Sequence, residues 1–187
     1  NIIQNKKFKD SFKNFKNIKY KSISNSMGII LGKNYHHDLV RPGISIYGGH
    51  FNTKMKSIIR PVICLKSKVL QIKEINKNEF VGYNQTFKTS KKIKVAIIAI
   101  GYADGISRVL SNKGEVYHEG KTYKIIGRVS MDSITIDITK NYQNIKEGVY
   151  MELINHEYGI DYHAKKSRTI CDEVLTSISK RVKRVYI

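Results

Sequence analysis

Three glycines in this chain each end an apolar run and stand directly before a side chain that could handle a proton or a charged ligand. They open the steps Gly82-Tyr83, Gly101-Tyr102 and Gly127-Arg128. Glycine lets the backbone adopt positive φ or approach a ligand closely. A tyrosine hydroxyl can donate or accept a proton, whereas an arginine stays charged. Three such points could converge on one pocket, so these residues predict a ligand site without identifying the ligand.

The three glycine steps belong to a longer series of five motifs. In order along the chain, the motifs are Val40–Gly48, Val81–Phe87, Gly101–Gly105, Gly127–Asp132 and Leu175–Tyr186. The series resembles the alanine racemase family, from about Ser22 to the last residue, and five motifs in order are a far stronger signal than one. The resemblance implies a homodimeric enzyme that interconverts L- and D-alanine with pyridoxal 5'-phosphate and supplies D-alanine for the cell wall.

By this resemblance, Tyr83 is the base that exchanges a proton with the L-alanine face of the substrate. Racemisation removes a proton from the α-carbon and returns one on the other face, so one base on each face is the simplest solution. A phenol titrates near ~10 when unperturbed, and such a base therefore needs positive charge nearby. The alternative is a tyrosine that caps a strand edge. Gly82 before it, with Tyr102 following in family order, favours the catalytic interpretation.

The cofactor site that the resemblance implies includes Arg41, which would hydrogen-bond the pyridine nitrogen of pyridoxal phosphate. Arginine does not lose its proton, so that nitrogen would stay unprotonated and transamination would be disfavoured. Alternatively, Arg41 is a surface arginine before a turn proline, and the Asn-Ser pair is an ordinary helix cap. Some family members carry a tyrosine in place of Lys180, although a lysine could still serve as a point charge. The residues expected at the phosphate are Asn25, Ser26, Gly43, Ile44 and Lys180.

The substrate side of the site is expected around Met131, which matches a family position whose backbone meets the substrate carboxylate. Tyr102, Arg108 and Arg128 match the corridor through which the substrate arrives. A lone methionine is more often core filler. Because a backbone contact is indifferent to the side chain, the assignment of Met131 depends on its position in the series alone.

The Schiff-base lysine of the family has no counterpart in this chain. In the family it belongs to the first barrel strand, upstream of the first motif, and no lysine here lies in a matching motif. We therefore expect the C-terminal part of an alanine racemase, which cannot by itself bind pyridoxal phosphate covalently and acts only together with a missing N-terminal part. Two alternatives stay open: an inactive gene remnant, and a non-catalytic basic β-barrel that binds RNA or a partner protein.

The charge of the chain invites a nucleic-acid interpretation, because 34 Lys+Arg against 15 Asp+Glu give a net charge of +19. The lysines are spread over nearly every segment, whereas nucleic-acid grooves combine clustered arginines with stacking aromatics, so we expect no nucleic-acid partner. Cys64 and Cys171 lack metal-binding spacing, which is typical of free thiols in a reducing compartment and predicts no metal site. No apolar run approaches the ~18 residues of a membrane span. The prediction is a cytoplasmic protein without membrane association.

The first part of the chain is expected to be α/β. An apolar stripe of three phenylalanines predicts an amphipathic helix over 2–17. Strands are expected over 18–24 and 40–47, with Asn25 capping a helix between them. This alternation predicts that residues 1–57 are the end of a TIM-type α/β barrel.

The remainder, residues 58–187, is expected to form an all-β, barrel-like C-terminal domain. A final helix is predicted over 169–179. The strands are predicted in runs rich in Ile and Val that end at Gly, Asn or Lys. These runs are 58–75, 93–100, 122–127, 133–139 and 149–154.

Overall fold

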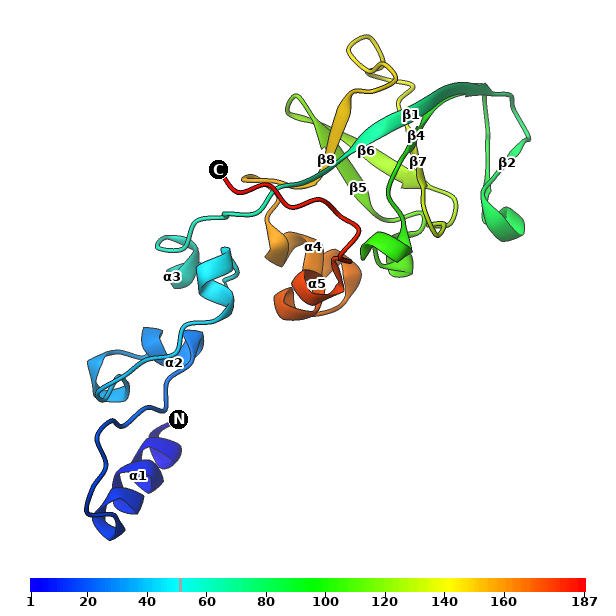
Figure 1. Ribbon diagram of the computed structural model, residues 1–187. Coiled ribbons are helices and arrows are strands. Elements are labelled where there is room, and N and C mark those ends of the chain that lie inside the picture. The colour runs from blue at the N-terminus through cyan, green and yellow to red at the C-terminus, as the bar shows by residue number, and fades with distance from the viewer. Residues whose placement is uncertain (51) are drawn as a thin grey trace. The chain divides into compact units, whose positions relative to one another are not determined.

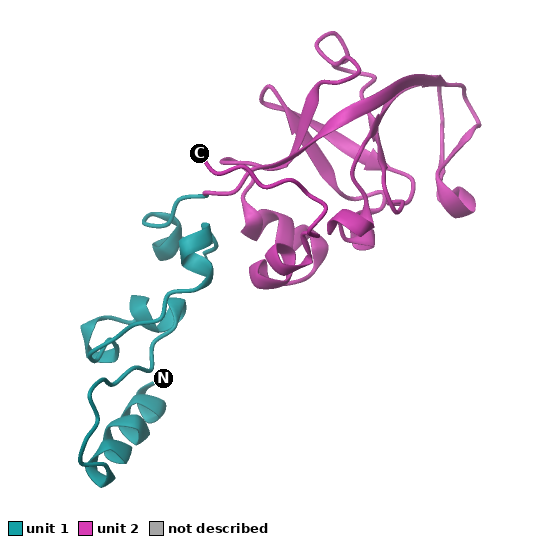
Figure 2. Ribbon diagram, in the orientation of Figure 1, with its two compact units in different colours: residues 1–61 teal, residues 62–187 magenta. Residues whose placement is uncertain are grey.

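The computed structural model describes residues 1–50 and 52–187 of the chain (Figure 1). The chain forms two compact units, residues 1–61 and residues 62–187, which Figure 2 colours teal and magenta. The first unit is mainly helical, and the second is built around a β-barrel. In the described part of the chain, no helix combines the length and the apolar character that a membrane crossing needs.

The first unit consists of short helices joined by irregular segments. The Asn25 Oδ1 accepts a hydrogen bond from the Gly28 N–H at 3.1 Å at the start of the second helix, which confirms the predicted cap. The helices are α1 (Ile2–Ser11), α2 (Ser26–Ile30) and α3 (Thr53–Lys56), with 3₁₀ turns η1 (Phe12–Asn14), η2 (Lys33–Tyr35) and η3 (Ile44–Tyr47).

The helix predicted over 2–17 is shorter than expected. A 3₁₀ turn follows α1, and Phe15 is already extended, with φ −122° and ψ 125°. Phe8 and Phe12 lie edge to face with their ring centroids 4.4 Å apart, and both contact the His37 ring. Phe15 is 65% exposed, so only the first two phenylalanines of the predicted stripe form it.

The prediction of strands over 18–24 and 40–47 is wrong, because neither segment forms a strand. The two segments meet at one isolated parallel bridge between Asn25 and Arg41. The ladder does not extend, because Pro42 has no N–H to donate and Asn25 already caps a helix. The second segment continues into the 3₁₀ turn η3 instead of a strand.

The second unit is a closed antiparallel barrel with the strand order β1-β4-β7-β6-β5-β8. A separate hairpin of β2 and β3 lies beyond the end of β1 (Figure 1). This architecture confirms the predicted barrel-like C-terminal domain. The strands are β1 (Leu65–Ile75), β2 (Phe80–Val81), β3 (Phe87–Lys88), β4 (Ile93–Ile98), β5 (Glu115–His118), β6 (Lys121–Ile126), β7 (Ile134–Asp137) and β8 (Tyr150–Ile154).

The core of the barrel is formed by the inward faces of its strands. In β7, for example, two buried isoleucines alternate with a partly exposed threonine and aspartate, as expected of a strand with one face inside. Each of the five predicted apolar runs overlaps a strand. The run 58–75 yields one only from Leu65 onward, and Pro61, which cannot donate to a sheet ladder, lies in its first part.

Two short helices follow the barrel strands. The helix predicted over 169–179 corresponds to α5, which is shorter at both ends. The sequence patterns do not predict α4 or β5: α4 buries Ile160, His163, Ala164 and Ser167, in which Ile160 is the one large apolar side chain, and β5 is only 4 residues long. These helices are α4 (Ile160–Ser167) and α5 (Cys171–Ser177), and the 3₁₀ turns of this unit are η4 (Tyr83–Gln85), η5 (Tyr102–Asp104) and η6 (Arg108–Leu110).

Burial of His163 should make the stability of the barrel unit depend on pH. His163 is 7% exposed, and burial lowers the pKa of its imidazole to about 4, opposed by a hydrogen bond to the Leu153 backbone. Because the folded pKa is lowered, the stability that neutral His163 contributes is complete above the unfolded pKa of 6.5 and is lost as the pH falls to about 4. We expect the free energy of unfolding to fall by about 3 kcal/mol over that range, as measured by denaturant unfolding at a series of pH values.

A matched pair of variants tests whether this pH dependence comes from His163. His163→Gln should remove it, because glutamine does not titrate. His156→Gln changes an exposed histidine of the same unit and should leave it in place. An unchanged pH slope in His163→Gln would contradict the assignment.

Candidate active site

The hairpin of β2 and β3 carries Tyr83 on the turn η4 between its strands. Gly82 begins this turn with φ 76°, in the left-handed region that glycine adopts without strain. A Cβ on Gly127 would lie only 2.7 Å from the Val81 carbonyl oxygen of the hairpin. The glycines therefore let two backbones touch, which holds the turn bearing Tyr83 against the segment Gly127–Asp132.

The second glycine step, Gly101-Tyr102, meets the same segment. The Tyr102 N–H donates to the Ser130 carbonyl at 2.9 Å, and the Ala103 N–H donates to the Met131 carbonyl at 3.0 Å. A Cβ on Gly101 would lie 2.3 Å from both of these carbonyl oxygens, so any other residue would force the two backbones apart. The close approach at Gly101 is thus to another part of the backbone, whereas the sequence predicts an approach to a ligand.

The three predicted glycine steps therefore converge, because the segment Gly127–Asp132 contacts the other two. The side chains expected to act there are open to solvent: Tyr83 is 69% exposed, Met131 53% and Tyr102 41%. Arg108 joins them through a cation–π contact, with its Cζ 5.9 Å from the Tyr102 ring centroid. Adjoining loops thus present two phenols and an arginine where a ligand or another protein surface could meet them.

Arg128 holds an unsatisfied donor in this region. Its Nε is buried, and no described residue accepts a hydrogen bond from it. A buried N–H without an acceptor costs free energy, and in native proteins such a group usually has an explanation in a bound water, ion or ligand. Guanidinium N–H groups bind carboxylates well, and Arg128 as a whole is only partly buried, which suits its expected place on the path of a carboxylate substrate.

In the first unit, Ser26 lies at the centre of a small cluster of donors. The Gly43 N–H donates to the Ser26 Oγ at 2.9 Å, and the Ser45 N–H and hydroxyl donate to the same oxygen at 3.4 and 3.1 Å. A Cβ on Gly43 would meet nothing within 4 Å, so space is open beside the cluster. The structure therefore brings together the residues expected at the phosphate in this unit, with Ile44 buried behind Gly43 and Asn25 capping α2.

Arg41 lies beside this cluster through its backbone bridge to Asn25. Its Nη1 donates to the Ser22 Oγ at 2.6 Å, and the residue as a whole is exposed. A guanidinium offers donors only, so a group that it faces must be an acceptor. Arg41 and the donors around Ser26 thus fit the pyridine nitrogen and the phosphate of pyridoxal phosphate, and these are the residues of this unit that would hold it.

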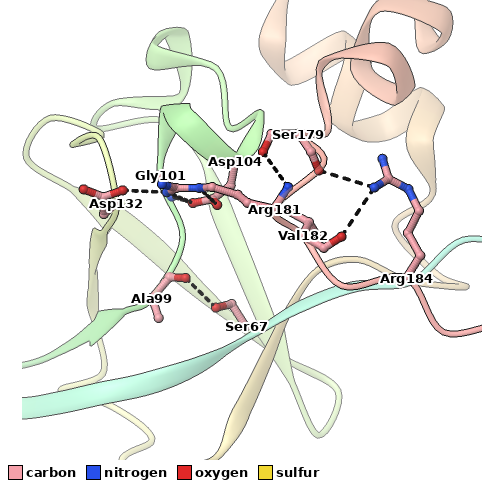
Figure 3. A network of polar contacts seen from close by, with 9 residues as sticks. All are labelled: Ser67, Ala99, Gly101, Asp104, Asp132, Ser179, Arg181, Val182 and Arg184. Atoms are coloured by element: carbon pink, nitrogen blue, oxygen red, sulfur yellow. Dashed lines mark hydrogen bonds and ion pairs between the residues drawn. The ribbon is translucent and has the colours of Figure 1, made fainter.

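The sequence patterns single out Lys180, but they give no role to Asp104, Asp132 and Arg181, which the structure joins by ion pairs (Figure 3). Lys180 is exposed, and its neighbour Arg181 ties the C-terminal segment to two other motifs. All three residues stand inside the series of five motifs. Opposite charges in separate motifs are therefore the sequence signal from which these three residues could have been predicted.

Comparison with known proteins gives the same family over both units. The model of the alanine racemase C-terminal domain matches residues 62–186, and that of the alanine racemase N-terminal domain matches residues 1–50. The chain is 40% identical over 180 residues to the alanine racemase of Brucella canis, across 89% of this chain and 46% of that enzyme. It is 39% identical over 188 residues to the alanine racemase of Rickettsia akari, across 100% of this chain and 51% of that enzyme.

Solved structures support the same family assignment. The crystal structure of alanine racemase from Bartonella henselae with covalently bound pyridoxal phosphate matches with a TM-score of 0.89 at 39% identity, across 99% of this chain and 51% of that one. The chain spans about half the length of the relatives it matches. The resemblance inferred from the five motifs is confirmed, and the chain belongs to the alanine racemase family.

Proposed function

We propose that this chain is the C-terminal part of an alanine racemase that interconverts L- and D-alanine with pyridoxal phosphate. The observation that carries the proposal is the contact between the glycine steps, which gathers Tyr83, Tyr102 and Met131 on adjoining loops with exposed side chains. Because the chain spans about half of its relatives, we assign the lysine that binds the cofactor to the other half. The active enzyme is then a cytoplasmic homodimer that contains both halves.

In this proposal, Tyr83 removes and returns the proton on the L-alanine face. Its turn is held by contact between backbones, so the main chain that bears the phenol is positioned before the substrate arrives. With 69% of its surface exposed, Tyr83 has room to be covered by a second protein surface. This exposure suits a base that reaches into the active site of a partner subunit, where covering it would exclude water from the proton transfer.

The substrate carboxylate would be bound by the backbone at Met131. The Met131 carbonyl already accepts a hydrogen bond from Ala103, whereas its N–H donates to none of the described residues. A backbone N–H can take a carboxylate oxygen whatever the side chain is. Arg128, with its buried unsatisfied Nε, and Arg108, beside Tyr102, would attract the same anion on its way in.

Ser26 and Arg41 would hold the cofactor. When bound, pyridoxal phosphate draws electron density away from the α-carbon of the substrate, so that its proton can be removed. The Ser26 Oγ accepts from the Gly43 N–H, and its own hydroxyl hydrogen suits an oxygen of a phosphate. Arg41 keeps its proton, so a ring nitrogen that faces it stays unprotonated and transamination is disfavoured. The phosphate role expected for Lys180 stays a prediction.

An inactive gene remnant and a non-catalytic basic β-barrel are the rival explanations. A barrel that binds RNA would do so with an affinity that falls steeply as salt is added. Neither rival requires Tyr83, Tyr102 and Met131 to lie on adjoining loops, whereas a racemase does.

Replacement of Tyr83 by phenylalanine should affect the two enantiomers differently. In the protein that includes the lysine-bearing half, Tyr83→Phe removes one base and leaves the base on the other face. Exchange of the α-hydrogen of L-alanine with D₂O should fall by a factor of roughly 10²–10⁴, and exchange from D-alanine should fall much less. Proton NMR of each enantiomer in D₂O measures the two rates.

Tyr142→Phe is the matched control, because it removes a hydroxyl from a tyrosine of the same unit that is 43% exposed and lies outside the glycine steps. It should leave both rates unchanged. Equal loss of exchange from both enantiomers in Tyr83→Phe would sink the two-base assignment and leave Tyr83 as a positioning or structural residue. No exchange in the unsubstituted protein would favour the remnant or the binding module.

Arg41→Glu should change the kind of product as well as the rate. A carboxyl group that faces the pyridine nitrogen favours protonation of that nitrogen, so transamination to pyruvate should rise while racemisation falls by about 10-fold or more. The ratio of pyruvate to D-alanine formed from L-alanine measures this change. Arg60→Glu makes the same charge change at an exposed arginine of the same unit and should not alter the ratio. An unaltered ratio in Arg41→Glu would contradict the assignment of Arg41 to the pyridine nitrogen of the cofactor.

A further inference from the structure

Arg181 joins two loops of the candidate site through carboxylates to which the family motifs assign no role (Figure 3). Its Nε donates to the Asp104 Oδ1 at 2.6 Å and its Nη2 donates to the Asp104 Oδ2 at 3.1 Å, which makes a bidentate pair. The same Nη2 donates to the Asp132 Oδ1 at 2.5 Å. One guanidinium therefore spans two carboxylates from different motifs.

Asp104 connects Arg181 to the turn that carries Tyr102. It ends η5, is 7% exposed, and its Oδ2 also accepts a hydrogen bond from the Gly101 N–H at 2.8 Å. Its backbone carbonyl accepts from the Ser179 N–H at 3.3 Å, so the C-terminal segment is fixed to the same turn. Without Arg181, the carboxylate of Asp104 would be a buried charge with no paired cation among the described residues.

Asp132 connects Arg181 to the loop that carries Met131. The side chain of Asp132 is 64% exposed, and exposed ion pairs contribute little to stability. The pair acts instead on the position of the backbone next to Asp132. The N–H groups of Tyr102 and Ala103 already bond to the Met131 loop, and Arg181 adds a further tie between the same two loops.

We propose that Arg181 is a positioning residue for the reaction: it holds the Met131 N–H in a fixed relation to Tyr102, where the substrate carboxylate binds. The inference rests on the proposed function, because Met131 is a substrate contact only within it. Arg181 acts through these two loops and touches neither substrate nor cofactor. Its effect should be the same for both enantiomers, since both present the same carboxylate, whereas only one presents its proton to Tyr83.

Steady-state kinetics of the protein that includes both halves test this role. Arg181→Lys keeps the positive charge but loses the planar fork that spans two carboxylates. We expect KM for both alanine enantiomers to rise by about 10-fold, with kcat changed by less than about 2-fold, because a contact made in both ground and transition states is weakened. Asp132→Asn leaves the Asp104 pair intact and should raise KM by less.

Arg184→Lys is the matched control in the same segment. Among the described residues, Arg184 donates only to the backbone carbonyls of Ile178, Ser179 and Val182. The substitution should leave KM unchanged for both enantiomers. An unchanged KM in Arg181→Lys and Asp132→Asn, even with a lower Tm, would overturn the proposal and reduce Arg181 to a structural ion pair.

Amide hydrogen exchange gives a second readout that needs neither substrate nor cofactor. The amides of Tyr102 and Ala103 should exchange faster in Arg181→Lys and at the unsubstituted rate in Arg184→Lys. A raised KM without faster exchange at these amides would overturn the proposed route through the loops. An inactive unsubstituted protein would refute the proposed function instead. In that case faster exchange would still support the holding of the two loops by Arg181, and unchanged exchange would overturn it.

Discussion

Direct contact between backbones at the segment Gly127–Asp132 is the constraint on which the rest of the candidate site depends. The hairpin at Gly82 and the turn at Gly101 each come closer to this segment than a side chain would allow. The turn at Gly101 cannot shift without breaking the hydrogen bonds from the Tyr102 and Ala103 N–H groups, and the hairpin packs its backbone directly against Gly127. The geometry of the site is therefore set by the main chain, and the exposed side chains are free to meet a substrate or a partner surface.

The closed barrel explains why these loops lie side by side. β4, β7 and β6 are neighbours in the barrel, and the register pairs Ile98 at the end of β4 with Ile134 at the start of β7. The turn at Gly101 and the loop that ends at Ser133 must then leave the barrel at the same point. That loop begins at Gly127, directly after β6, so it carries the whole segment Gly127–Asp132 to the turn at Gly101. A change in this register would separate Tyr102 from Met131, although neither residue belongs to a strand.

Features decided by the chemistry of one residue or one short pattern could be predicted from the sequence. Asn25 caps a helix, Gly101 marks a close approach, and the long apolar runs form barrel strands. Features that depend on distant partners could not be predicted. The two strands expected in the first unit form only one isolated bridge, and the buried face of α4 combines one isoleucine with a histidine and two small residues, which is too weak an apolar pattern to reveal a helix. The pairing of Arg181 with Asp104 joins residues 77 positions apart, so only the fold brings their charges together.

The central claim is that this chain contributes one of two halves of a racemase active site. Formation of D-alanine from L-alanine in the presence of pyridoxal phosphate tests it most directly, first with this chain alone and then with the chain joined to an N-terminal half that bears the lysine. We expect no D-alanine from the chain alone and steady racemisation once the two halves are joined. Racemisation by the chain alone, or none after joining, would contradict the claim.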